Sequence, residues 1–83
     1  MDNTVILVFN HVKMNKQFDI EVPLNITANE FIYGLNAGFH LGIDMNNVAA
    51  CYLCTEEPKA LLRGDRLLED FGLRDGTIIT YRK

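Results

Sequence analysis

Apolar and polar residues alternate along two stretches near the start of the chain. The segment 17–22, QFDIEV, places its three apolar residues on one side of a strand and Asp19 and Glu21 on the other. The preceding segment 4–10 is rich in β-branched residues and also predicts a strand, so that the polar residues between the two form a hairpin connection. Pro23 ends the second strand because proline has no amide hydrogen to donate to a neighbour.

The pattern then changes to the spacing of an amphipathic helix. Thr27 and Glu30 are three residues apart, as in a capping box, where hydroxyl and carboxylate bind free amides of the first helical turn. The apolar residues that follow at helical spacing are Phe31, Ile32, Leu35 and Phe39. This pattern predicts a helix over about residues 28–41, and Gly42 stands where a left-handed cap is needed.

The second half of the chain is built from shorter apolar runs. Segments 47–55 and 60–62 predict a third and a fourth strand, with a turn between them. In 66–73 the apolar residues are too close for a strand and too few for a long helix, which favours a single helical turn that plugs one end of a core. After an Asp-Gly turn, 77–81 predicts the last strand.

One helix with a single apolar stripe needs one sheet to cover it, which predicts a two-layer α+β domain. A β-grasp roll accommodates every element, with a mixed sheet of about five strands packed on one α-helix and residues 1–83 forming a single domain. Chains of this length bury only about 60–65% of the surface that is exposed in the unfolded state. The predicted core consists of Val5, Leu7, Phe9, Phe18, Ile20, Val22, Phe31, Leu35, Leu68, Ile79 and Tyr81.

The first and last predicted strands are apolar on both sides, although only one sheet face can meet the helix. Ile6, Val8 and Ile78 are therefore expected on the outer face, with Tyr52 beside them. Exposed apolar residues on an acidic surface are typical of a protein-binding site. The alternative is that loops or a second copy of the chain, in a homodimer, cover this face.

Composition narrows the classes of partner and of chemistry. A net charge of −3 and a pI of about 5.2 argue against nucleic acid and against an anionic membrane surface. No signal peptide or membrane-spanning stretch is visible, so we expect a cytoplasmic protein. Serine is absent, and no nucleophile–base pair, phosphate-binding glycine loop or carboxylate cluster is present, so we expect neither an enzyme nor a cofactor.

Cys51 and Cys54 have the spacing of a redox or zinc motif. In a strand, however, residues three apart point to opposite faces and are about 10 Å apart along it, too far to bond. We therefore expect one buried and one exposed free thiol, and a thiol or metal-binding module remains an alternative. Neither His11 nor His40 adds the paired spacing of a zinc site, and His40 is expected to act at the helix end.

Two further motifs have simple structural explanations. The tripeptide Arg63-Gly64-Asp65 could be a cell-adhesion ligand, but a tight turn that requires glycine is the preferred interpretation. Gly34 and Gly38 lie inside the predicted helix, where each costs about 0.8–1.0 kcal/mol relative to alanine. That cost indicates close approach to the helix backbone, either by a loop or by a partner.

Two stretches carry a resemblance to a known family. GDRLLEDFGLRDGTIITY is similar to the C-terminal third of ubiquitin-like domains, and together with QFDIEVPLNITANEFI it most resembles the YukD/EsaB family. These are small ubiquitin-like proteins associated with bacterial type VII secretion. The resemblance extends over nearly the whole chain, although CYLC is not part of the family pattern.

The resemblance implies a non-catalytic adaptor that binds the secretion ATPase or another membrane subunit from the cytoplasm, without inserting into the membrane itself. Ubiquitin and the sulfur carriers of this fold react through a C-terminal Gly-Gly, which lets the tail pass through a narrow enzyme channel. This sequence contains no Gly-Gly and stops at Tyr81-Arg82-Lys83. A ubiquitin-like modifier or carrier is therefore the disfavoured alternative.

Overall fold

The computed structural model describes residues 3–47, 51–56 and 59–82. Its elements follow one another in the predicted order of strand, strand, helix, strand, strand, short helical turn and strand. They are β1 (Thr4–His11), β2 (Lys16–Pro23), α1 (Ala28–Phe39), β3 (Leu53–Glu56), β4 (Ala60–Leu62), the 3₁₀ turn η1 (Leu68–Phe71) and β5 (Ile78–Tyr81).

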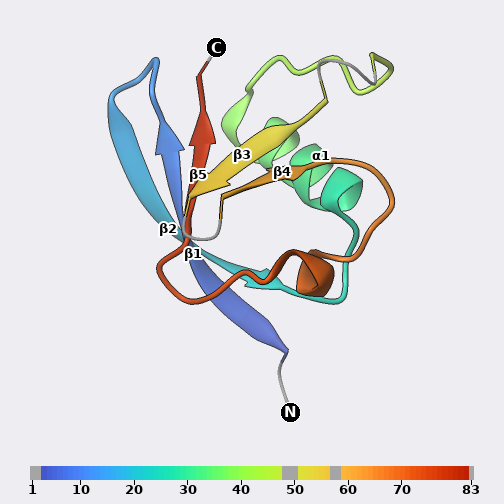
Figure 1. Cartoon of the computed structure of the whole chain (residues 1–83). Coiled ribbons are helices and arrows are strands. Elements are labelled where there is room, and N and C mark those ends of the chain that lie inside the picture. Colours follow the sequence, from blue (N-terminus) through green and yellow to red (C-terminus); the bar gives the residue numbers. More distant parts are fainter. Residues whose placement is uncertain (1–2, 48–50, 57–58, 83) are drawn as a thin grey trace.

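The five strands form one mixed sheet in the order β2-β1-β5-β3-β4, with α1 on one of its faces (Figure 1). β1 and β5 pair in parallel, and the other neighbours pair antiparallel. The first and the last strand thus lie side by side inside the sheet, while β2 and β4 are its edges. The predicted two-layer β-grasp roll is confirmed.

The core lies between the sheet and the helix. Leu7, Phe9, Ile32, Leu68 and Ile79 are fully buried. Every residue predicted for the core belongs to this cluster, with Phe18 and Ile20 packed against it as partly buried members. The alternation along β1 and β2 therefore identified the correct face of each strand.

The start of α1 is held by the predicted capping box and by a distant loop. The Thr27 hydroxyl accepts a hydrogen bond from the Glu30 amide at 3.1 Å, and the Glu30 carboxylate accepts one from the Thr27 amide at 2.9 Å. The next two helix amides, of Ala28 and Asn29, donate to the carbonyls of Arg66 and Gly64. The loop before η1 therefore completes the helix N-terminus, whose amides have no partner within the helix.

The end of α1 differs from the prediction. The helix ends at Phe39, and the left-handed capping residue is His40 (φ 54°) rather than Gly42. The Asn36 side chain explains the early stop, because its amide binds both the N–H and the C=O of Ile43 at 2.9 Å and turns the chain back. Gly42 also has a positive φ, but in the loop beyond the cap.

The third strand is shorter than predicted. β3 begins at Leu53, which pairs with Leu62, and it extends one residue past the predicted end to Glu56. Residues 48–50 of the predicted strand lie outside the described residues, and Cys51 and Tyr52 precede β3. A strand forms only where a neighbour supplies its hydrogen bonds, and β4 and β5 do so from Leu53 onward.

The predicted helical plug is confirmed as η1. Leu68 is fully buried, and its amide donates to the Ile26 carbonyl at 2.8 Å. The guanidinium of Arg66 lies over the Phe71 ring, 5.2 Å from its centre, and covers the outer side of the turn. Gly72 then ends η1 in the left-handed conformation (φ 71°).

Candidate interaction face

The outer face of the sheet, opposite α1, brings three of the four predicted partner-binding residues together. Val8 on β1 is the direct parallel partner of Ile78 on β5, and Ile6 lies two residues before Val8 on the same side of β1. Ile6 is 42% exposed, whereas Val8 and Ile78 are partly buried. We call these three residues the apolar strip.

Carboxylates lie next to the apolar strip on both sides. On β2, Glu21 is paired with Ile6 and Asp19 with Val8. On β3, Glu56 is paired with Ile78. All three acidic residues are exposed, and their side chains share the face of the strip because directly paired residues point to the same side of a sheet. Only the strand register reveals this arrangement.

The turn before β5 fixes the position of the strip. The Asp75 carboxylate accepts a hydrogen bond from the Ile6 amide at 2.8 Å, and the Gly76 amide donates to the Ile6 carbonyl at 2.8 Å. Gly76 has φ 90°, a conformation that residues with a side chain rarely adopt. The predicted Asp-Gly turn therefore also joins the start of β5 to β1.

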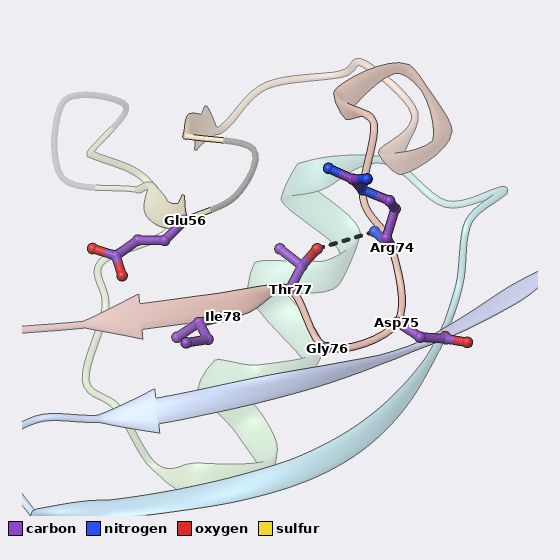
Figure 2. A pocket seen from close by; sticks show the side chains of 6 residues that line it. All are labelled: Glu56, Arg74, Asp75, Gly76, Thr77 and Ile78. Atoms are coloured by element: carbon purple, nitrogen blue, oxygen red, sulfur yellow. Dashed lines mark hydrogen bonds between the residues drawn. The ribbon is translucent and has the colours of Figure 1, made fainter.

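A pocket of about 450 Å³ lies beside the strip, between the end of β3 and the turn that leads into β5 (Figure 2). Glu56 and Arg74 lie on opposite sides of it, and Ile78, a member of the strip, also lines it. The Thr77 hydroxyl accepts a hydrogen bond from the Arg74 amide at 3.0 Å and closes the turn. The pocket thus adds to the apolar strip a hollow lined by two acidic residues, Glu56 and Asp75, and one basic residue, Arg74.

Tyr52 is not part of this arrangement. Its side chain is 38% exposed, but β3 meets Ile78 at Glu56, four residues further along the chain. Four residues of extended chain span about 13 Å, so Tyr52 lies away from the strip. The expectation that Tyr52 stands beside the other three residues is wrong, because the sequence does not reveal the β3–β5 register.

The two cysteines have the expected opposite environments. Cys51 is buried and Cys54 is exposed, and both are free thiols. Burial raises the pKa of the Cys51 thiol, because the charged thiolate is disfavoured away from water. Its sulfur lies 3.7 Å from the Met45 sulfur and 3.9 Å from the Asn29 side-chain oxygen. Among the described residues, no group of three or more His, Cys, Asp or Glu side chains is placed to hold a metal ion.

The histidines lie in separate structural settings. His11 is buried at the end of β1, where its ring packs edge-on against Tyr81 at 5.2 Å and its Nδ1 accepts a hydrogen bond from the Met14 amide at 3.4 Å. His40 is exposed at the end of α1. Both positions are accounted for by packing or by capping.

The Arg-Gly-Asp tripeptide forms a turn that is bound to the helix. Gly64 has φ 82°, its amide donates to the Asn29 side chain at 3.1 Å, and its carbonyl accepts from the Asn29 amide at 3.1 Å. Both backbone groups of Gly64 are thus bound by α1. This geometry supports the interpretation of the tripeptide as a structural turn.

No described loop packs closely against the two helix glycines, Gly34 and Gly38. At Gly34 and at Gly38, an added β-carbon would have no described atom of the chain within 4 Å, and both residues are exposed. Within the described residues, close approach of another segment therefore does not explain them. Of the two explanations raised by the sequence, approach by a partner remains.

The sheet order, the single helix across one face and the helical plug define a ubiquitin-like domain. Solved ubiquitin-like structures share this fold at low sequence identity. The C-terminal ubiquitin-like domain of mouse tubulin-specific chaperone e is 13% identical, with a TM-score of 0.74, over 98% of this chain and 87% of that one. The ubiquitin-like domain of Plasmodium falciparum Dsk2 is 15% identical, with a TM-score of 0.61, over 93% of this chain and 96% of that one.

A family model assigns the chain to one family among the proteins with this fold. The model described as "WXG100 protein secretion system (Wss), protein YukD" matches residues 7–80. The chain belongs to the YukD family, as its C-terminal motifs and its hairpin-to-helix passage predict. No protein with a curated description matches it significantly. No helix among the described residues has the length and apolar character needed to cross a membrane.

Proposed function

We propose that this protein is a non-catalytic adaptor of a bacterial type VII secretion system that binds a component of the machinery through the apolar strip. Membership of the YukD family supports the link to secretion. The observation that carries the binding role is the direct pairing of Val8 with Ile78 next to the exposed Ile6. A sheet face that exposes apolar side chains is available to another protein.

The carboxylates beside the strip define the complementary surface. A partner that covers Ile6, Val8 and Ile78 with apolar side chains meets exposed carboxylates on both sides. Basic residues around its apolar centre would therefore speed association and exclude acidic competitors. The partner that we propose is the secretion ATPase or another membrane subunit, bound from the cytoplasm at the inner face of the membrane.

The test is a binding measurement with the purified cytoplasmic part of the cognate secretion ATPase, followed by the same measurement with the other cytoplasmic subunit domains. Ile6→Glu and Ile78→Glu place a charge in the apolar strip and should abolish binding. Leu61→Glu is the matched control, because Leu61 is 43% exposed on β4, at the opposite edge from β2. It should leave binding intact.

Two outcomes would contradict the proposal. Binding that survives both strip substitutions but is lost in Leu61→Glu would place the interface at the other end of the sheet. A wild-type protein that binds none of the cytoplasmic domains would remove the adaptor role altogether.

A further inference from the structure

A second surface lies on the other side of the molecule, where the edge strand β2 meets the helix. A groove of about 210 Å³ runs between them and is walled by the apolar side chains of Ile20, Val22, Phe31 and Leu35. Gly34 lines it from the helix, and a β-carbon added there would meet no described atom within 4 Å outside its own stretch of helix. The absence of a side chain at Gly34 therefore leaves the groove open.

The backbone of β2 next to this groove has hydrogen-bonding groups that the sheet does not use. Val8 donates its amide to Thr77 on the β5 side of β1, so the pair Val8–Asp19 is not a hydrogen-bonded pair of the β1–β2 ladder. The Leu24 amide donates to the Asn3 carbonyl at 2.7 Å, next to β1. Because the residues that bond to the neighbouring strand alternate in an antiparallel pair, Val22 and Ile20 also direct their backbone groups toward β1. The N–H and C=O groups of the alternate residues, Gln17, Asp19 and Glu21, thus point outward along the sheet edge.

A strand added to this edge would have two different sides. Its residues beside Ile20 and Val22 would point into the groove over Gly34, because directly paired residues on neighbouring strands point to the same face of a sheet. Its remaining residues would stand beside the exposed side chains of Asp19 and Glu21 on the outer face. The edge therefore favours a segment in which apolar and basic residues alternate.

Charge decides between a partner segment and a second copy of this chain. Antiparallel pairing of β2 with β2 of a second copy would bring Asp19 and Glu21 against the same acidic residues, and like charges on paired strands are destabilising. Glu30 at the groove adds a further negative charge, and no basic side chain lines the described groove. The same carboxylates attract a basic segment.

We propose that the β2 edge and the groove beside α1 bind an extended segment of a partner protein with alternating apolar and basic residues, as an additional strand of the sheet. This mode supplies affinity through main-chain hydrogen bonds and selectivity through the groove. The groove and the edge amides lie outside the apolar strip, so the site does not depend on the function proposed above, although Asp19 and Glu21 stand between the two surfaces. The protein would then hold two partners, or two parts of one partner, on adjacent surfaces.

The probe is a synthetic peptide of eight residues, the length of β2, in which lysine and valine alternate and both ends are blocked. NMR titration of the intact protein should show shifts at Gln17, Asp19, Glu21 and Gly34. The three edge amides should also become protected from hydrogen exchange, which nonspecific charge attraction does not produce. A peptide with lysines and valines in separate blocks has the same charge and should bind at least about tenfold more weakly.

Matched variants locate the site. Gly34→Leu fills the groove and should weaken binding of the alternating peptide about tenfold or more, whereas Gly34→Ala should change it by less than about twofold. The β-carbon of either residue enters open space, so each variant should keep the domain folded, which circular dichroism checks. The double variant Asp19→Lys, Glu21→Lys should reverse the preference, toward a peptide that alternates glutamate and valine. Ile6→Glu should not weaken the lysine–valine peptide.

Three results would overturn the proposal. One is equal affinity for the alternating and the block peptides. Another is a set of shifts confined to Ile6, Val8 and Ile78 without protection of the edge amides. The third is a wild-type dimer in sedimentation experiments that Gly34→Leu dissociates, which would make a second copy of the chain the occupant of the groove.

Discussion

Asn29 and Tyr81 show how single side chains join parts of the chain that are far apart in sequence. The Asn29 side chain binds the amide of Gly64 and its backbone binds the Gly64 carbonyl, so the Arg-Gly-Asp turn is attached to the first turn of α1. The Tyr81 hydroxyl donates to the Leu41 carbonyl at 2.7 Å inside the core and attaches the loop after the helix to the last strand. Neither contact follows a local sequence pattern.

The buried thiol leads to a prediction about pH. Burial raises the pKa of Cys51 in the folded protein above that of the unfolded chain. The neutral thiol therefore stabilises the fold fully below the unfolded pKa, and this contribution is lost as the pH rises above about 8.5, where the unfolded thiol ionises. Urea unfolding under reducing conditions should thus show wild-type stability falling between about pH 7.5 and 9.5.

Two single substitutions isolate that effect. Cys51→Ala should remove this part of the alkaline loss, while Cys54→Ala should retain it because Cys54 is exposed. Equal pH dependence in the two variants would assign the loss to other groups.

Among the elements, α1 has a well-capped N-terminus but contains two glycines with low helix propensity. Its N-terminus has a capping box and two carbonyls from a distant loop, whereas Gly34 and Gly38 add backbone freedom inside it. The structure places no described segment against either glycine. Both glycines thus lower helix stability without improving the packing of the domain.

Glycine substitutions should therefore have opposite effects in the helix and in the turn. Gly38→Ala should raise the free energy of unfolding by about 0.5–1 kcal/mol, because alanine loses less backbone freedom and has open space for its methyl group. Gly64→Ala should lower it by about 1 kcal/mol or more, because Gly64 has φ 82°. Urea unfolding of both variants measures the difference, and a loss of stability in Gly38→Ala would show that the helix face is covered.

In the whole molecule, the parallel pairing of β1 with β5 creates the surface on which the proposed function depends, because it joins Val8 to Ile78. It brings the first and the last strand together in the middle of the sheet and leaves one face of the pair toward α1 and the other outward. The inner residues form the core and the outer residues form the apolar strip. The side of β1 that faces away from α1 is thus left exposed at Ile6 and partly exposed at Val8.

This division predicts contrasting effects on folding. Leu35→Glu buries a charge in the hydrophobic core that the described residues form, at a cost of about 4 kcal/mol or more, comparable with the total stability of a domain of this size. It should unfold the protein, as circular dichroism and urea titration would show. Ile6→Glu should cost less than about 1 kcal/mol, because Ile6 is 42% exposed. Unfolding by Ile6→Glu would mean that the two faces of β1 are assigned the wrong way round.

Local patterns in the sequence were sufficient for the elements and their inward faces. Alternation in β2, the capping box of α1 and the close apolar spacing in η1 each depend on residues within a few positions of one another, so they are readable without the fold. The helix end and the start of β3 were not readable, because Asn36 acts through Ile43 and β3 forms only beside β4 and β5.

The candidate surfaces divide in the same way. The sequence alone determined that Ile6, Val8 and Ile78 are apolar residues on the outer face, because a strand's two sides alternate by residue. The folded chain was needed to establish that Val8 and Ile78 are partners, that Tyr52 lies elsewhere, that carboxylates flank the strip and that Gly34 opens a groove beside a free edge. These facts depend on strand register and on helix placement, which are set by contacts between residues distant in the chain.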